Sequence, residues 1–267
     1  MKHRPAIDDL APFFDDPCWM WVVLAREAPV AVIFRRGPSK WWRITRWDTR
    51  RDFFDHGQWF HGRMYPDRCG LSPDGNLLVY FAGKFRQRDQ ASGYGYTWTA
   101  VSRPPYLTAL ALWPIGDTWG GGGVFVENQT LQIIAPVLQH HPNHPPGRLR
   151  VSIINDAGVK FYRAPNSLRK SCGDFTLVCS PRTPEYDEME PSRRRKTFTI
   201  ERANEGIIAS FEAHWAGWDQ RGRLIATVGG RVLVATPIPR KLKWRELASM
   251  KDETPQAMES PAWAKGW

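Results

Sequence analysis

Residues 69–85 read CGLSPDGNLLVYFAGKF, and this stretch decides the fold. Its centre is a Pro73-Asp74-Gly75 turn, followed at once by an apolar run at residues 77–81. Proline presets φ for a turn, aspartate hydrogen-bonds to its own backbone, and glycine accepts a positive φ. The pattern therefore predicts a tight turn leading into a short buried strand, the arrangement expected in one unit of a protein built from repeated sheets.

The rest of the chain shows similar short runs of β-branched and aromatic residues between turns. Such runs are typical of strands, and we expect them at residues 19–24, 30–34, 41–47, 77–81, 98–102, 106–113, 124–126, 130–134, 149–154, 159–162, 175–179, 197–200 and 206–211. A further outer strand is expected around Trp59 and Phe60, and Gly229-Gly230 predicts a two-residue hairpin turn within residues 218–234. Residues 239–250 are expected to form a short amphipathic helix.

Two phrases of the sequence look alike. Residues 71–80 read LSPDGNLLVY and residues 218–227 read WDQRGRLIAT. In addition, turn glycines recur at intervals of roughly 40 residues, apart from one longer interval that contains a charged insertion; they are Gly37, Gly75, Gly116, Gly158 and Gly222. A period of this length with several strands in each unit indicates a sheet repeat.

Both phrases resemble the SPDG-x-x-(L/I)-(A/V) phrase of the blades in WD-repeat and TolB-type β-propellers. The resemblance is local, at residues 71–80 and 218–227. It implies an all-β blade-repeat protein, a small propeller for which about five blades fit the length. The alternative is a β-sandwich or β-barrel with long loops.

Composition changes along the chain suggest its organisation. We expect an N-terminal arm at residues 1–18, a β-repeat domain at residues 19–236 and a C-terminal extension at residues 237–267. Residues 180–196, SPRTPEYDEMEPSRRRK, join an acidic cluster to a basic one and are expected to form an exposed, flexible insertion.

The overall composition limits the possible settings. The 267 residues carry a net charge of +10 and include 14 tryptophans and four cysteines. No secretory signal or membrane-spanning apolar run is visible, so we expect a cytoplasmic protein with free thiols and no membrane partner. The positive charge favours polyanionic partners, nucleic acid among them.

Residues 35–51, RRGPSKWWRITRWDTRR, interleave cations with indole rings. This combination is typical of single-stranded nucleic-acid grooves. The candidate nucleic-acid residues are Arg35, Arg36, Lys40, Trp42, Arg43, Arg46, Arg50 and Arg51. In a strand neither face of this segment is wholly basic, so we favour the interpretation that the tryptophans belong to the core and arginine stems pack across them.

The residues give no support to catalysis, a metal site or a cofactor. His140, His141 and His144 lie close together but lack an evident carboxylate or cysteine partner, so an exposed polar loop is favoured. The glycine run at residues 120–123 is followed by a strand-like segment, where a phosphate loop would be followed by a helix. No nucleophile motif is present, although a hydrolase site at a propeller's mouth remains a third hypothesis.

We therefore expect a non-catalytic protein-interaction or scaffold subunit of a larger complex. Tryptophan is enriched among interface anchors, so the candidate partner-binding residues are Trp244, Trp263 and Trp267. The alternative function is a nucleic-acid-associated protein that uses its basic, tryptophan-rich surface.

Overall fold

The computed structural model describes residues 6–7, 10, 18–85, 93–154, 168–180, 195–238 and 241–267. Within these residues the strands form five separate sheets, in which most neighbouring strands are antiparallel. The helical segments there are two 3-10 turns, Pro66–Arg68 and Ala262–Ala264. The prediction of an all-β protein is confirmed.

The chain divides into two compact units. The first unit comprises residues 1–21 and 164–253, and the second comprises residues 22–163 and 254–267. The chain therefore enters the second unit, leaves it to build most of the first, and returns to it with the C-terminal segment.

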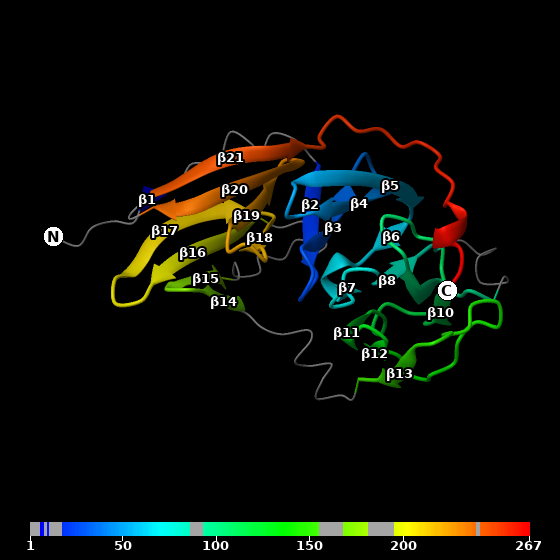
Figure 1. The fold of residues 1–267 in the computed structure, drawn as a ribbon. Coiled ribbons are helices and arrows are strands. Elements are labelled where there is room, and N and C mark those ends of the chain that lie inside the picture. The colour runs from blue at the N-terminus through cyan, green and yellow to red at the C-terminus, as the bar shows by residue number, and fades with distance from the viewer. Residues whose placement is uncertain are drawn as a thin grey trace. The chain divides into compact units, whose positions relative to one another are not determined.

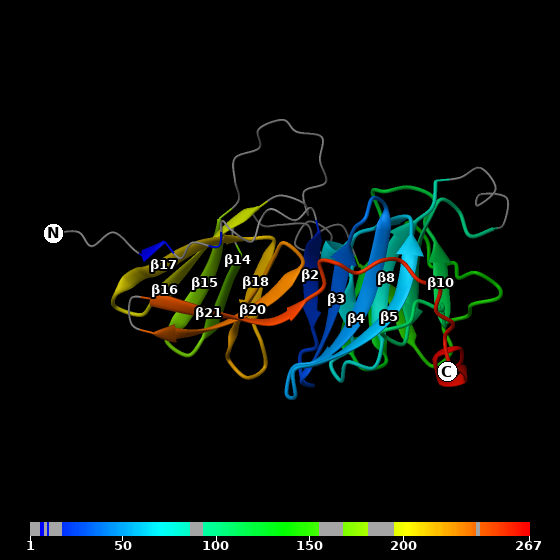
Figure 2. The ribbon, with the colours of Figure 1, turned by 90° about the horizontal axis from the view of Figure 1, so that it is seen from above.

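The first sheet of the chain has the strand order β2-β3-β4-β5 (Figure 2). Its β3 strand is buried along nearly its whole length because valine, isoleucine and phenylalanine occupy both of its faces. The predicted strands are confirmed, with bounds β2 (Trp19–Leu24), β3 (Val30–Arg36), β4 (Trp41–Asp48) and β5 (Phe53–His61).

The stretch that decides the fold lies in the second sheet, of order β10-β9-β8-β6 with β7 also paired to β8. Every residue of β8 is buried. The last strand is shorter than the predicted 106–113, because only its C-terminal part pairs with β9. The bounds are β6 (Arg63–Met64), β7 (Gly70–Leu71), β8 (Leu78–Gly83), β9 (Thr97–Ser102) and β10 (Ala111–Pro114).

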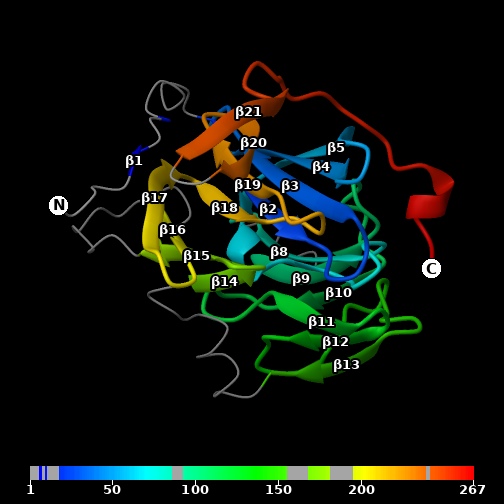
Figure 3. The same cartoon turned by 60° about the vertical axis from the view of Figure 1, so that its left-hand side comes forward.

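The third sheet contains the two strands predicted at residues 124–126 and 130–134, which pair antiparallel, and one parallel strand (Figure 1). Its strands are β11 (Gly123–Glu127), β12 (Thr130–Ile133) and β13 (Arg150–Ile153), and β13 runs parallel to β12. The strand predicted at residues 159–162 lies outside the described residues. The second and third sheets lie next to each other (Figure 3) and share one hydrophobic cluster, which includes Val79, Val101, Phe125 and Leu131.

The fourth sheet has the order β1-β17-β16-β15-β14. Its strands are β1 (Ala6–Ile7), β14 (Leu168–Cys172), β15 (Phe175–Ser180), β16 (Lys196–Arg202) and β17 (Gly206–Ala213). Two residues of the predicted N-terminal arm thus pair in parallel with β17. Of the predicted insertion at residues 180–196, residues 181–194 lie outside the described part of the chain.

The fifth sheet has the order β18-β19-β20-β21. Its strands are β18 (Trp215–Trp218), β19 (Leu224–Val228), β20 (Arg231–Ile238) and β21 (Lys241–Ser249). The predicted hairpin turn at Gly229-Gly230 is confirmed, and both glycines have positive φ. Residues from the fourth and fifth sheets form one core cluster, among them Ile200, Phe211 and Leu224.

The helix predicted at residues 239–250 is wrong, because this segment contains the edge strand β21. Leu242 and Trp244 alternate as a strand requires, but a register shift then places Leu247 as an extra residue opposite the Val232/Leu233 step. A bulge of this kind changes apolar spacing from two to three residues. In the sequence alone that spacing looks helical.

Candidate functional site

The two similar phrases form turns of related construction, of which the first is one residue longer. Ser72 and Asp219 each donate their backbone N–H to a carbonyl across the turn, Leu77 O (2.9 Å) and Arg223 O (3.0 Å). The glycine three residues later, Gly75 or Gly222, donates back to the first residue's carbonyl, with φ of 72° and 71° respectively. In each case the turn joins two neighbouring antiparallel strands, β7 to β8 and β18 to β19.

The turn at residues 72–77 is held firmly by side chains. Ser72 Oγ donates to Asp74 Oδ1 (2.5 Å) and accepts the Leu77 N–H (2.9 Å), while Asn76 Nδ2 donates to Asp74 Oδ2 (2.9 Å). Burial raises the pKa of Asp74, but the hydrogen bonds from Ser72 and Asn76 outweigh it and leave the pKa below its ordinary value. Asp74 therefore stays ionised and keeps the turn in one conformation.

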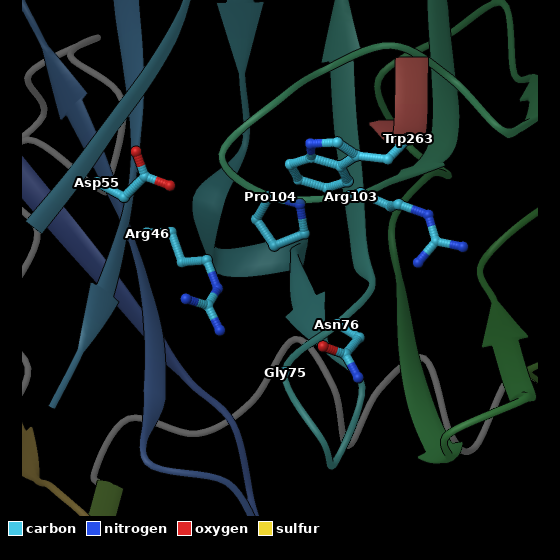
Figure 4. A pocket seen from close by; sticks show the side chains of 7 residues that line it. All are labelled: Arg46, Asp55, Gly75, Asn76, Arg103, Pro104 and Trp263. Carbon is cyan, nitrogen blue, oxygen red and sulfur yellow. The ribbon is translucent and has the colours of Figure 1, made fainter. Parts of the chain in front are cut away.

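This turn forms one side of a pocket of about 280 Å³ in the second unit (Figure 4). We call it the Arg46 pocket, and its lining residues are Arg46, Asp55, Gly75, Asn76, Arg103, Pro104 and Trp263. They come from β4, β5, the turn before β8, the segment after β9 and the 3-10 turn near the C-terminus. The pocket thus combines two guanidinium groups, one carboxylate, one amide and an apolar wall of proline and indole.

The C-terminal segment brings Trp263 to this pocket. Gln58 Nε2 donates to Met258 O (2.9 Å), and the hydroxyls of Thr108 and Ser260 lie 2.6 Å apart. The indole of Trp263 meets the ring of Tyr106 edge-on, with 5.4 Å between ring centroids. The side chain of Trp263 is therefore held in place although 58% of the residue is exposed.

The three predicted partner-binding tryptophans occupy different surroundings. Trp244 lies on β21, is only partly exposed and packs edge-on against Phe211 at 5.0 Å. Trp267 is 43% exposed and lies close to Gly147, where a Cβ atom would come within 2.5 Å of its Nε1. The structure therefore presents Trp263 and Trp267 to solvent and uses Trp244 mainly for packing.

The predicted nucleic-acid residues do not form one basic surface. Arg35 is only 2% exposed, and its guanidinium lies 5.3 Å from the Trp59 ring centroid. Arg43 approaches the same ring at 5.5 Å, and Arg36 lies 5.5 Å from the ring of Trp42, which is itself buried. This arrangement agrees with the favoured interpretation, core tryptophans with arginine stems packed across them.

The remaining members of that set reach solvent. Lys40 and Arg50 are exposed, and the side chain of Arg51 is 82% exposed with a long contact of 3.8 Å to Asp48. Arg46 lines the pocket. The pocket therefore joins one residue from each predicted set, Arg46 and Trp263, which no sequence pattern connected.

The histidine-rich loop is packed against tyrosine. His141 stacks on Tyr94 at 4.2 Å between ring centroids, and the Tyr94 hydroxyl lies 3.1 Å from His144 Nε2. Burial lowers the pKa of His144, and the nearby His141 lowers it further. The hydrogen bond between His144 Nδ1 and the Ala109 carbonyl (3.0 Å) raises the pKa but does not outweigh burial. Over the described residues, no three His, Cys, Asp or Glu side chains converge as metal ligands.

The glycine run at residues 120–123 serves packing. The Gly121 N–H donates to Ile134 O (2.6 Å) and the Gly122 N–H to Thr99 Oγ1 (2.8 Å). A Cβ atom on Gly121 would come within 2.1 Å of the Phe81 ring. These amides are already used inside the fold, so the run is a close-packed turn.

The sequence reasoning missed Asp55, Asn76, Arg103 and Pro104. Asp55 lies on β5, Asn76 lies in the turn before β8, and Arg103 and Pro104 are adjacent in the segment after β9. They form no recognised motif. Of these four residues, only Asn76 could have been suspected from the sequence, because it directly follows the Pro-Asp-Gly turn.

A scan of the sequence against protein-family models finds no match, and neither does a search of curated proteins. Among the described residues, no helix has the length and apolar character needed to span a bilayer.

Proposed function

We propose that this protein is a non-catalytic interaction subunit of a larger complex, with the rim of the Arg46 pocket as its partner-binding surface. The observation that carries the proposal is Trp263, an exposed indole held on Tyr106 beside the pocket. Tryptophans at the centre of interfaces dominate binding energies. A ring that is already fixed loses little conformational entropy when a partner covers it.

The proposal includes a five-bladed β-propeller in which each sheet is one blade. Two observations support it. The five sheets follow one another along the chain, apart from the short β1 strand. The turns at residues 72–77 and 219–223 differ by one residue in length but share a positive-φ glycine that donates back to the first residue, and each joins two antiparallel neighbours. A cytoplasmic setting is also part of the proposal, supported by four cysteines that are all free.

The test is a pull-down of the tagged full-length protein from its native cell, washed at low and high salt, with and without nuclease. We expect a stoichiometric protein partner that remains bound at high salt. Trp263→Ala should weaken partner binding by about thirtyfold or more and so lower the yield, since anchor residues contribute roughly 2 kcal/mol or more. The matched control is Trp119→Ala, because Trp119 is 78% exposed and does not line the pocket.

Two outcomes would count against the proposal. One is that no stoichiometric protein is retained. The other is that a partner is retained equally by Trp263→Ala and the original protein.

Nucleic-acid binding is the second candidate function, and the exposed cations Lys40, Arg50 and Arg51 favour it. Under this proposal the retained material is nucleic acid that leaves with nuclease or salt, because phosphate contacts release counterions. Arg51→Gln would then weaken oligonucleotide binding and make it less sensitive to salt.

A further inference from the structure

The Arg46 pocket combines groups that suit one kind of ligand. We infer that it binds a glutamate or aspartate side chain of the partner, within an extended acidic segment of that protein. This inference rests on the proposed interaction function and adds the chemistry of recognition to it.

The first argument is the charge of Arg46. Its guanidinium makes no hydrogen bond or ion pair with any residue that the structure describes. Asp55 is its cross-strand neighbour, but the Asp55 carboxylate points away from the Arg46 guanidinium (Figure 4). A half-buried guanidinium in this state is a ready donor for a carboxylate, which it can bind through two parallel N–H bonds.

The second argument is the wall of the pocket. Trp263 and Pro104 lie next to each other and give the pocket an apolar side (Figure 4). This side suits the methylene groups of an acidic residue, or an apolar residue next to it in the partner. Arg103 also lines the pocket, and its Nε donates to Gly266 O at 3.3 Å.

The third argument distinguishes a peptide from a nucleic acid. The pocket also contains acceptors, the Asp55 carboxylate and the side-chain carbonyl of Asn76. Peptide N–H groups on either side of an acidic residue can donate to them, whereas the phosphate groups of a nucleic acid have no donor to offer. A volume of about 280 Å³ fits one side chain with its peptide groups and is too small for a stacked strand of nucleotides.

The pocket is also preorganised. The Asn76 side chain is held by Asp74, and the Asp74 backbone N–H donates to Asn128 Oδ1 at 2.9 Å. Fixing the pocket before binding reduces the entropy that a ligand must overcome.

The experiment is a fluorescence-anisotropy titration of the full-length protein. The probe is a short fluorescein-labelled peptide that alternates glutamate with threonine, so that every residue keeps its backbone N–H, and the control peptide has glutamine in place of every glutamate. A single-stranded oligonucleotide of equal formal charge is titrated in parallel. We expect the glutamate peptide to bind at least about tenfold more tightly than the glutamine peptide.

The variants test whether this binding uses the pocket. Arg46→Gln should weaken binding of the glutamate peptide by about tenfold or more, the loss expected when a charged hydrogen bond is removed. Arg51→Gln removes the same formal charge from an exposed position outside the pocket, and should change the affinity less than about twofold. Circular dichroism of both variants establishes that they are folded.

Three results would overturn the inference. The first is that the glutamate peptide does not bind. The second is that Arg51→Gln weakens binding of the glutamate peptide as much as Arg46→Gln does, which would indicate general charge attraction. The third is that the oligonucleotide binds more tightly than the glutamate peptide and that its binding depends on Arg46. The proposed function fails in a different way, by the absence of any stoichiometric partner in the pull-down. If a partner is retained and Arg46→Gln leaves its yield unchanged, only this inference is refuted.

Discussion

His214 makes the stability of the first unit sensitive to acid. It lies between β17 and β18, is 7% exposed, and its backbone N–H donates to Thr227 O at 2.9 Å. Burial, with a smaller contribution from the charge of Arg195, lowers the pKa of His214 from 6.5 to about 4. The folded protein therefore holds this imidazole neutral at a pH where the unfolded chain protonates it.

The sign and size of the effect follow from proton linkage. A histidine whose pKa is lowered by folding contributes stability that is complete above the unfolded pKa and is lost as the pH falls toward the folded pKa. Each pKa unit corresponds to about 1.4 kcal/mol. Protonation of His214 should therefore lower the free energy of unfolding by about 3 kcal/mol between about pH 7 and about pH 4.

The measurement is urea unfolding at a series of pH values, for the original protein and for His214→Gln. Other groups such as His144 titrate in both proteins, so the difference between the two curves isolates His214. Between about pH 7 and about pH 4, the free energy of unfolding of His214→Gln should fall by about 3 kcal/mol less than that of the original protein. His140→Gln, at an exposed position, is the control and should follow the original curve. Identical pH dependence of His214→Gln and the original protein would refute the reasoning.

Two further substitutions test packing and turn structure by chemical denaturation. Gly121→Ala should destabilise the protein by about 3 kcal/mol or more, because the position has a φ of 91° and its Cβ would overlap Phe81; Gly116→Ala, with a φ of 85° and nothing within 4 Å, should cost only about 1 kcal/mol. Equal losses would show that the contact with Phe81 is unimportant. Asp219→Ala should cost about 3 kcal/mol, since it removes the acceptor for two backbone N–H groups and leaves Arg223 without its 2.7 Å partner; an unchanged unfolding midpoint would contradict this.

Local patterns predicted the all-β class and most of the strands. The aromatic and β-branched runs at residues 19–24 and 98–102 are strands whose bounds agree with the prediction to within one residue, because side-chain shape and turn chemistry act over a few residues. The strand at residues 241–249 was missed because its bulge is determined by pairing with β20, which local spacing does not show. The parallel pairing of β13 with β12 likewise depends on contacts across the sheet.

The candidate site was predictable only in part. Trp263 was singled out by residue type and Arg46 by its place in a basic segment, but nothing in the sequence placed them in one pocket. Arg35 illustrates the opposite problem, since a cation that reads as a surface residue is 2% exposed beside Trp59. Burial and proximity arise from how sheets pack, and residue types alone do not report them.

The route of the chain through the second unit has a consequence for translation. Gln58 contacts Met258, a residue 200 positions later, and Trp263 reaches the same unit still later in the sequence. A ribosome therefore exposes Arg46 and Asn76 long before it delivers the indole that completes their pocket. A nascent chain, or one truncated before Trp263, lacks that wall, so under the proposed function the partner would bind only chains whose synthesis has passed this point.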